Sequence, residues 1–198
     1  MADTSVETTL SNHPVPEAPL EDNGSGLAPA GEGWFVVNVR DAQWVTSEEG
    51  EKQPTGSECV FESRKAPFQQ YGIKLHVLPP GQANGLYHRE SEQEDFLVLT
   101  GECLLLVEGE ERRLRAWDFV HCPPRTEHIF VGAGDEPCVI LMAGARSEDW
   151  RVLYPVSELA ARYGASAKDE TPDPDQAYDG FEPSRRERPA YWDRLPWA

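Results

Sequence analysis

The sequence predicts an all-β protein, a sandwich or barrel of antiparallel strands. Many short apolar runs follow one another between residues 59 and 142, at intervals of about ten residues in the second half of this region. Turn-forming residues separate these runs, among them Gly109 and the pair Pro123-Pro124. The runs do not alternate with helical segments, and no glycine-rich phosphate loop is present. Both features argue against a nucleotide-binding α/β fold.

The expected strands are short and are bounded by turn signals. They lie at residues 34–39, 59–61, 71–78, 96–99, 103–107, 112–117, 118–122, 128–131 and 138–142. Residues 42–44 either continue the first strand or pack beneath it, and 46–57 read as a long exposed loop. In the run 71–78 the residues alternate, with Lys74 and His76 on one face. We interpret His76 as a surface or cross-strand residue rather than a cavity residue.

A short helix is expected over residues 155–163, after the last strand. Its apolar residues recur at helical spacing, with Pro155 at the start and Gly164 after the end. Beyond it, residues 185–198 are unusually aromatic and include Trp192 and Trp197. Large rings bury ~150–250 Å² each, so either the chain's own barrel or a neighbouring subunit should cover them.

Composition divides the chain into three parts. Residues 1–32 hold six acidic residues and no Lys or Arg, which is typical of a disordered tail. Residues 33–165 form the expected β-barrel domain with its short helix. Residues 166–198 form an extended C-terminal tail.

The charge of the chain excludes several partners. The net charge of −17 argues against binding to nucleic-acid backbones or anionic membranes. No signal peptide is evident, and no apolar run approaches the ~20 residues of a membrane span. The four cysteines form no CxxC pair, so we interpret them as free thiols of a cytoplasmic protein.

The most informative stretch is residues 81–101, which contains His88, Glu90 and Glu94. Their spacings of two and four place them on one face if the stretch is a strand through Glu94. Acids that lead into the buried run 96–99 are costly to desolvate unless a positive charge compensates them. Imidazole and carboxylate together suit zinc, iron, manganese or nickel. The alternative is a solvated strand end on which the acids simply face water.

Together with a second stretch, this region resembles the cupin superfamily. The first cupin motif, a glycine, two histidines, a glutamate and a glycine, is matched here by Gly81, His88, Glu90, Glu94 and Gly101. The second motif is matched over residues 117–132, with Pro123 and His128 in place. The chain departs from the family in two ways. Glu90 stands where the second histidine belongs, and the second motif lacks both glycines and its asparagine.

The resemblance implies an antiparallel jelly-roll barrel with a divalent metal ion held by His88, Glu90, Glu94 and His128. Glu90 is the weakest of these ligands, and its alternative role is to orient a water or accept a proton. His121 is expected to line the cavity as a supporting catalytic residue, the alternative being a half-buried strand histidine. For His128 the alternative is a core histidine with no ligand role.

The family hosts many activities, so the resemblance does not name a reaction. We expect a metal-dependent enzyme, such as an oxygenase or isomerase, that acts on a small organic molecule. The alternatives are a non-catalytic barrel that binds a small ligand and a structural barrel whose metal only stabilises it. The resemblance also implies a homodimer, because exposed sheet edges need cover.

Overall fold

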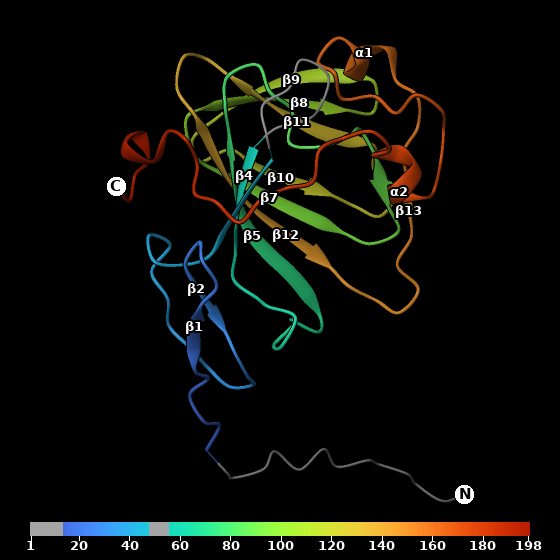
Figure 1. Cartoon of the computed structure of the whole chain (residues 1–198). Helices are drawn as coiled ribbons and strands as arrows, with labels where there is room; N and C mark the ends of the chain where they lie inside the picture. The colour runs from blue at the N-terminus through green and yellow to red at the C-terminus, as the bar shows by residue number, and fades with distance from the viewer. Residues whose placement is uncertain (1–13, 48–55) are drawn as a thin grey trace, which may run out of the picture.

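Two antiparallel sheets face each other and form the body of the molecule (Figure 1). The computed structural model describes residues 14–47 and 56–198. The larger sheet has six strands in the order β10-β7-β12-β5-β4-β3. Their bounds are β3 Trp44–Ser47, β4 Gly56–Val60, β5 Tyr71–Leu78, β7 Glu94–Thr100, β10 Phe119–Cys122 and β12 Cys138–Ala145.

The smaller sheet has three strands in the order β11-β8-β9. Its strands are β8 Glu102–Val107, β9 Glu110–Arg115 and β11 His128–Ala133. Two short strands, β6 Arg89–Glu90 and β13 Val152–Leu153, pair with each other at the open end of the barrel. The jelly-roll barrel predicted from the sequence is confirmed.

The main core fills the space between the two sheets. Alternate residues of β7 and β12, such as Phe96 and Ile140, meet Leu105 and Phe130 from the smaller sheet. This is the pattern expected when period-two strands bury one face each. Cys103, Cys122 and Cys138 are free and buried in this core, and Cys59 is free and buried on the outer side of the larger sheet.

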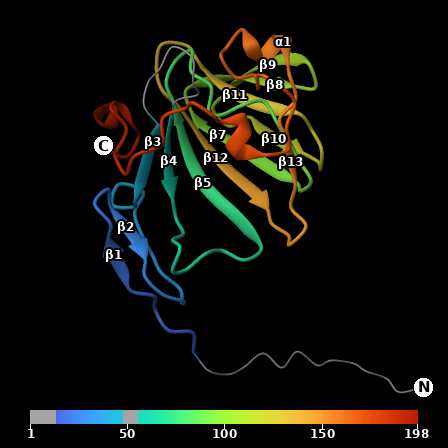
Figure 2. The same cartoon turned by 45° about the vertical axis from the view of Figure 1, so that its right-hand side comes forward.

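The C-terminal segment covers the outer face of the larger sheet (Figure 2), and Val37 and Val39 pack against the same cluster. Trp44 is fully buried there, and the rings of Trp192 and Trp197 pack on it with centroid distances of 5.5 Å. Leu195 is also buried in this cluster. The aromatic C-terminus therefore packs on its own barrel, one of the two covers expected from the sequence.

The structure differs from the sequence prediction for the first strand. Residues 34–39 make no ladder: Trp34 forms a single bridge with Glu17, and Val36 is exposed. The sheet edge beside β3 is instead occupied by the C-terminal segment, because Thr46 bridges Arg185. Residues 34–39 alternate between more and less exposed side chains, but without a partner strand they form no β-ladder.

The N-terminal segment also differs where the structure describes it. Residues 14–32 contain a small hairpin of β1 Leu20–Asp22 and β2 Leu27–Pro29, and Ala28 is buried (Figure 1). Residues 1–13 of the predicted disordered tail lie outside the described residues. So do residues 48–55 of the predicted loop.

The helices of the described residues are all short and follow the last strand. The predicted helix is present as α1 Glu158–Ala161, and the Ser157 side chain caps it by accepting from the Ala160 amide. Helix α2 Pro174–Ala177 and the 3-10 helix η1 Trp192–Arg194 follow. No helix of the described residues is long and apolar enough to span a membrane.

Candidate metal centre

His88 and His128 are brought together by a reciprocal pair of backbone hydrogen bonds. The His128 amide donates to the His88 carbonyl at 2.8 Å, and the His88 amide donates to the His128 carbonyl at 3.2 Å. Residues opposite each other in an antiparallel bridge project their side chains to the same side. The two imidazole centroids accordingly lie 5.0 Å apart.

Each of these rings is oriented by a second backbone contact. His88 Nδ1 lies 2.7 Å from the Leu86 carbonyl oxygen, and His128 Nδ1 lies 3.0 Å from that of Thr126. A carbonyl oxygen can only accept, so in both neutral rings Nδ1 carries the proton and Nε2 has a free lone pair. This arrangement is typical of metal-binding histidines.

Glu94 completes a cluster with the two histidines. One ligand atom from each of His88, Glu94 and His128 lies within 4.8 Å of the others. Glu94 Oε2 is 3.5 Å from His128 Nε2. Glu94 is the first residue of β7, whereas His128 opens β11 in the opposite sheet. The cluster thus joins the two sheets at the open end of the core.

Glu90 lies beside this cluster and has a partner of its own. Its Oε1 is 3.8 Å from His88 Nε2, and its Oε2 accepts a hydrogen bond of 2.7 Å from the Trp150 indole nitrogen. The stretch 88–94 is not one continuous strand, because β6 ends at Glu90 and β7 begins at Glu94. Both carboxylates line the cavity, but Glu90 lies outside the three-residue cluster.

Burial and neighbouring charge keep His88, Glu94 and His128 uncharged in the metal-free protein. Burial lowers the pKa of His128 to about 4, and the nearby His88 adds to this effect. Burial also lowers the pKa of His88. Burial and the Glu90 carboxylate raise the pKa of Glu94 to about 8. Neutral imidazoles are ready to donate lone pairs, and a cation would replace the proton of Glu94.

The cluster opens into a cavity of about 420 Å³ inside the barrel. Its apolar lining includes Phe96, Phe130 and Met142, and the centroid of the Phe96 ring lies 5.2 Å from that of His128. Tyr154 packs near His88, with 5.8 Å between ring centroids. A cavity of this size with a few convergent polar groups is typical of a small-molecule site.

His121, predicted to line this cavity, lies elsewhere. It pairs with Asp95 across β10 and β7, and its Nδ1 is 2.7 Å from Asp95 Oδ1. Its side chain is half exposed, and it is not among the cavity residues. Glu94 faces inward, so its neighbour Asp95, and His121 with it, faces outward.

His76 is the cavity residue that the sequence interpretation underestimated. It is buried, lines the cavity and lies opposite Glu58 in the β4–β5 ladder. Its Nε2 is 2.8 Å from Glu58 Oε1, yet within the described part of the chain neither ring nitrogen has a well-aligned hydrogen bond. Burial lowers the pKa of His76 although Glu58 opposes the shift. The cross-strand part of the prediction is confirmed, and the surface part is wrong.

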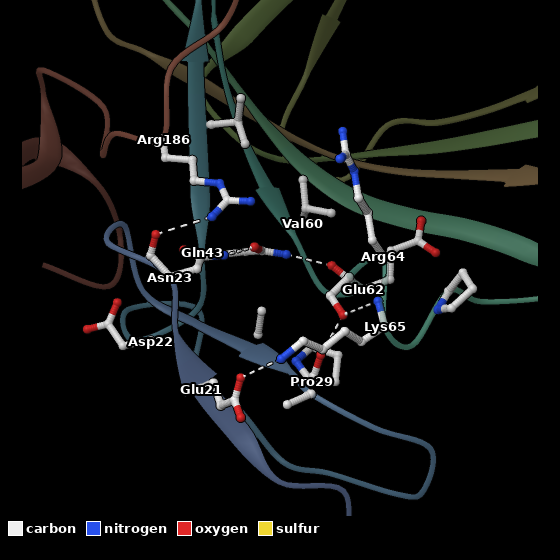
Figure 3. Close-up of a pocket in the computed structure, with 15 residues that line it drawn as sticks. Glu21, Asp22, Asn23, Pro29, Gln43, Val60, Glu62, Arg64, Lys65 and Arg186 are labelled. Atoms are coloured by element: carbon white, nitrogen blue, oxygen red, sulfur yellow. Dashed lines mark hydrogen bonds and ion pairs between the residues drawn. The ribbon is translucent and has the colours of Figure 1, made fainter.

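A second hollow of about 640 Å³ lies outside the barrel, between the N-terminal hairpin and residues 60–67 (Figure 3). Gln43 crosses it, accepting from the Asn23 amide and donating 2.5 Å to the Glu62 carbonyl. Lys65 pairs with Glu21 at 2.8 Å. These contacts join the hairpin to the barrel. The metal cluster is not part of this hollow and lines the cavity inside the barrel.

The comparisons with known proteins agree with this geometry. Residues 74–144 match the family described as "Cupin domain", a range that contains His88, Glu94 and His128. This match supports membership of the cupin superfamily for the barrel region of the chain. A search of curated proteins found no match.

Solved structures are similar to parts of the chain. A sugar phosphate isomerase of the cupin superfamily from Silicibacter pomeroyi is 21% identical with a TM-score of 0.52, and the match covers 60% of this chain and 80% of that one. A cupin-2 domain from Rhodospirillum rubrum is 18% identical with a TM-score of 0.45, covering 53% and 70%. A protein described as "Putative sugar phosphate isomerase" from Acidithiobacillus ferrooxidans is 26% identical with a TM-score of 0.46. The match covers 50% of this chain and spans 64% of the length of that one.

The buried histidines predict how the stability of the metal-free protein depends on pH. The folded-state pKa values of His76, His88 and His128 are all lowered from 6.5, so the unfolded chain binds more protons just below that pH. The free energy of unfolding should be unaffected by these groups above about pH 6.5 and fall below it, by up to ~1.4 kcal/mol per pH unit for each histidine. His76→Leu should reduce this slope, measured by urea unfolding between pH 5 and pH 7. An unchanged slope in the variant would show that His76 is charged in the native state.

Proposed function

We propose that this cupin is a metal-dependent enzyme that acts on a small organic molecule in its barrel. The observation that carries the proposal is the convergence of His88, Glu94 and His128, with both Nε2 lone pairs free at one end of a cavity. Two neutral imidazoles and one carboxylate suit a divalent ion such as zinc, iron, manganese or nickel. Three protein ligands leave coordination positions open for substrate or water.

A bound divalent ion would polarise a substrate oxygen or lower the pKa of a water. The protein residues would perform the other tasks. Leu86 and Thr126 fix the ring orientations through their carbonyl oxygens. Phe96 and Phe130 keep the inner wall apolar, which strengthens electrostatic interactions at the centre.

Glu90 is proposed as a residue that orients the centre or moves a proton, with direct ligation as the weaker alternative. Its Oε2 is already bound by Trp150, while Oε1 remains near His88. A carboxylate fixed at one oxygen by an indole presents the other oxygen in a defined direction. His121 is no longer proposed for catalysis, because it faces the outside of the sheet.

The chemistry of the cavity favours an enzyme over the two alternative functions. A barrel that only stores a ligand has no need of a carboxylate whose pKa is raised to about 8 beside two oriented imidazoles. A metal that only stabilises the barrel would require no open cavity of about 420 Å³ around it. The free cysteines fit a reducing compartment, and we propose the cytoplasm.

Removal of the proposed ligands should weaken metal binding. His128→Ala and Glu94→Gln should weaken it by more than the ~10–100-fold that follows loss of an outer orienting group, because each removes a donor atom. Glu90→Gln should fall within that range. Metal content after dialysis against zinc or manganese, measured by elemental analysis, checks both expectations.

His121→Ala is the matched control for these variants, since it removes an imidazole from the outer face of the same barrel. It should retain the full metal content. Full metal content in the double variant His88→Ala/His128→Ala would place any ion elsewhere. The enzyme proposal would then lose its support, and a ligand-binding or structural barrel would be the better account.

We also propose a homodimer formed through the uncovered end of the larger sheet. The C-terminal segment covers the part around Trp44 and Val77. At the opposite edge strand, β10, Phe119 and Trp117 remain exposed by 65% and 74%. An open edge strand beside exposed aromatic rings is usually paired or covered, and a second copy would satisfy both needs.

Sedimentation should therefore show a dimer at micromolar concentrations, and Phe119→Lys should shift it to monomer without loss of metal. Val36→Lys is the control, because Val36 is 80% exposed and lies outside the proposed interface. A monomeric wild-type protein would contradict the dimer. A Phe119→Lys variant that remains dimeric would contradict the chosen face.

A further inference from the structure

The wall of the cavity carries a second polar group, formed by Glu58, Lys74 and His76. All three residues line the same cavity as the metal cluster. They come from β4 and β5, whereas the metal cluster comes from β7, β11 and the segment before β6. In the ladder Glu58 lies opposite His76, and Lys74 lies opposite Val60, one step along the same face.

Lys74 is held in place by Glu58. Its Nζ is 3.1 Å from Glu58 Oε1, the same oxygen that His76 Nε2 approaches to 2.8 Å. Although burial opposes the shift, His76 and Lys74 hold the pKa of Glu58 well below its usual range. The carboxylate therefore stays charged and fixes the position of the ammonium group.

Lys74 still has donors to offer. An ammonium group has three N–H donors, and the contact with Glu58 uses one of them. Arg146, the other cation among the described cavity residues, already uses three of its five N–H donors on the protein. It forms a bidentate pair with Glu62 and donates 2.7 Å to the Phe68 carbonyl. Lys74, with its single printed contact to Glu58, is therefore the less engaged of the two cations in the described cavity lining.

Lys74 also lines the same cavity as the proposed metal ligands His88, Glu94 and His128. A ligand inside the cavity can therefore meet both the open positions at the metal cluster and the free donors of Lys74. Such a ligand needs a metal-binding oxygen at one end and an anionic group at the other.

The charge balance of the cavity favours a group with a single negative charge over one with two. Four carboxylates line the cavity, namely Glu58, Glu62, Glu90 and Glu94, against the two cations Lys74 and Arg146. Even with a divalent ion bound there is no excess of positive charge. A phosphate dianion is best bound by several cations, and both cations here already pair with carboxylates of the protein. A carboxylate requires only one ammonium group.

We propose that the substrate is a small organic carboxylic acid whose carboxylate binds Lys74 while another oxygen binds at the metal centre. The inference rests on the proposed function, because it requires the metal cluster at the other end of the cavity. In this account Lys74 determines specificity, and Glu58 and His76 are positioning residues that act through it. Glu58 and His76 need not contact the substrate themselves.

The test uses pairs of ligands that differ by one charge. Protein loaded with cobalt(II) is titrated with malonate, succinate and glutarate, and with the monomethyl ester of each, while the cobalt absorption spectrum is followed. At the chain length that spans the cavity, the diacid should bind ~10–100-fold more tightly than its ester, as expected for a charge-assisted hydrogen bond. Lys74→Met should abolish this preference while retaining cobalt.

Lys168→Met is the control, since Lys168 is exposed and remote from the barrel cavity. It should keep the wild-type preference. Equal affinities for diacid and ester in cobalt-loaded wild type, or a preference that survives in Lys74→Met, would overturn this inference and leave the metal centre intact. Tighter, Lys74-dependent binding of 3-phosphonopropionate than of succinate would overturn the carboxylate class. Failure of wild type to bind cobalt at the cluster would overturn both proposals.

Discussion

The candidate site depends on one backbone interaction, the reciprocal hydrogen-bonded bridge between His88 and His128. It fixes two residues that are far apart in the sequence side by side, with both rings on the same face of the bridge. The carbonyls of Leu86 and Thr126, each two residues before a histidine, then set the ring orientations. The imidazoles are thus positioned by the backbone of the barrel and not by flexible side-chain contacts. Glu94 comes from the other sheet, so the site requires that the two sheets face each other.

The larger sheet separates two environments in this protein. Its inner face passes from an apolar core at Phe96 and Ile140 to charged residues at the open end. Its outer face, which includes Trp44, is covered by Leu195 and the aromatic rings of the C-terminus. Since strands alternate, neighbours such as Glu94 and Asp95 belong to different environments. This explains why burial raises the pKa of Glu94 to about 8, whereas the pKa of Asp95 is lowered, burial being outweighed by its hydrogen bonds to His121 and Gln93.

Much of the barrel could be predicted from the sequence, because its strands carry clear local signals. The strand at 71–78 has the predicted bounds, and His88, Glu94 and His128 do converge. The predictions failed where the outcome depends on partners from distant segments. Residues 34–39 alternate like a strand but find no ladder partner, because the C-terminal segment bridges to the edge of β3. His121 is directed outward by the register of β10 on β7, and His76 is buried by Glu58 from the neighbouring strand. Register between strands is not encoded in any short stretch of the chain.

The central claim is that one divalent ion binds between His88, Glu94 and His128. The most direct measurement is an anomalous-difference map from crystals loaded with zinc or cobalt, collected at the absorption edge of the metal. The account predicts a single strong peak at ~2.0–2.2 Å from both Nε2 atoms and a Glu94 carboxylate oxygen. A peak at Glu90 and Trp150 without the histidines, or a barrel cavity without any peak in metal-loaded crystals, would contradict it.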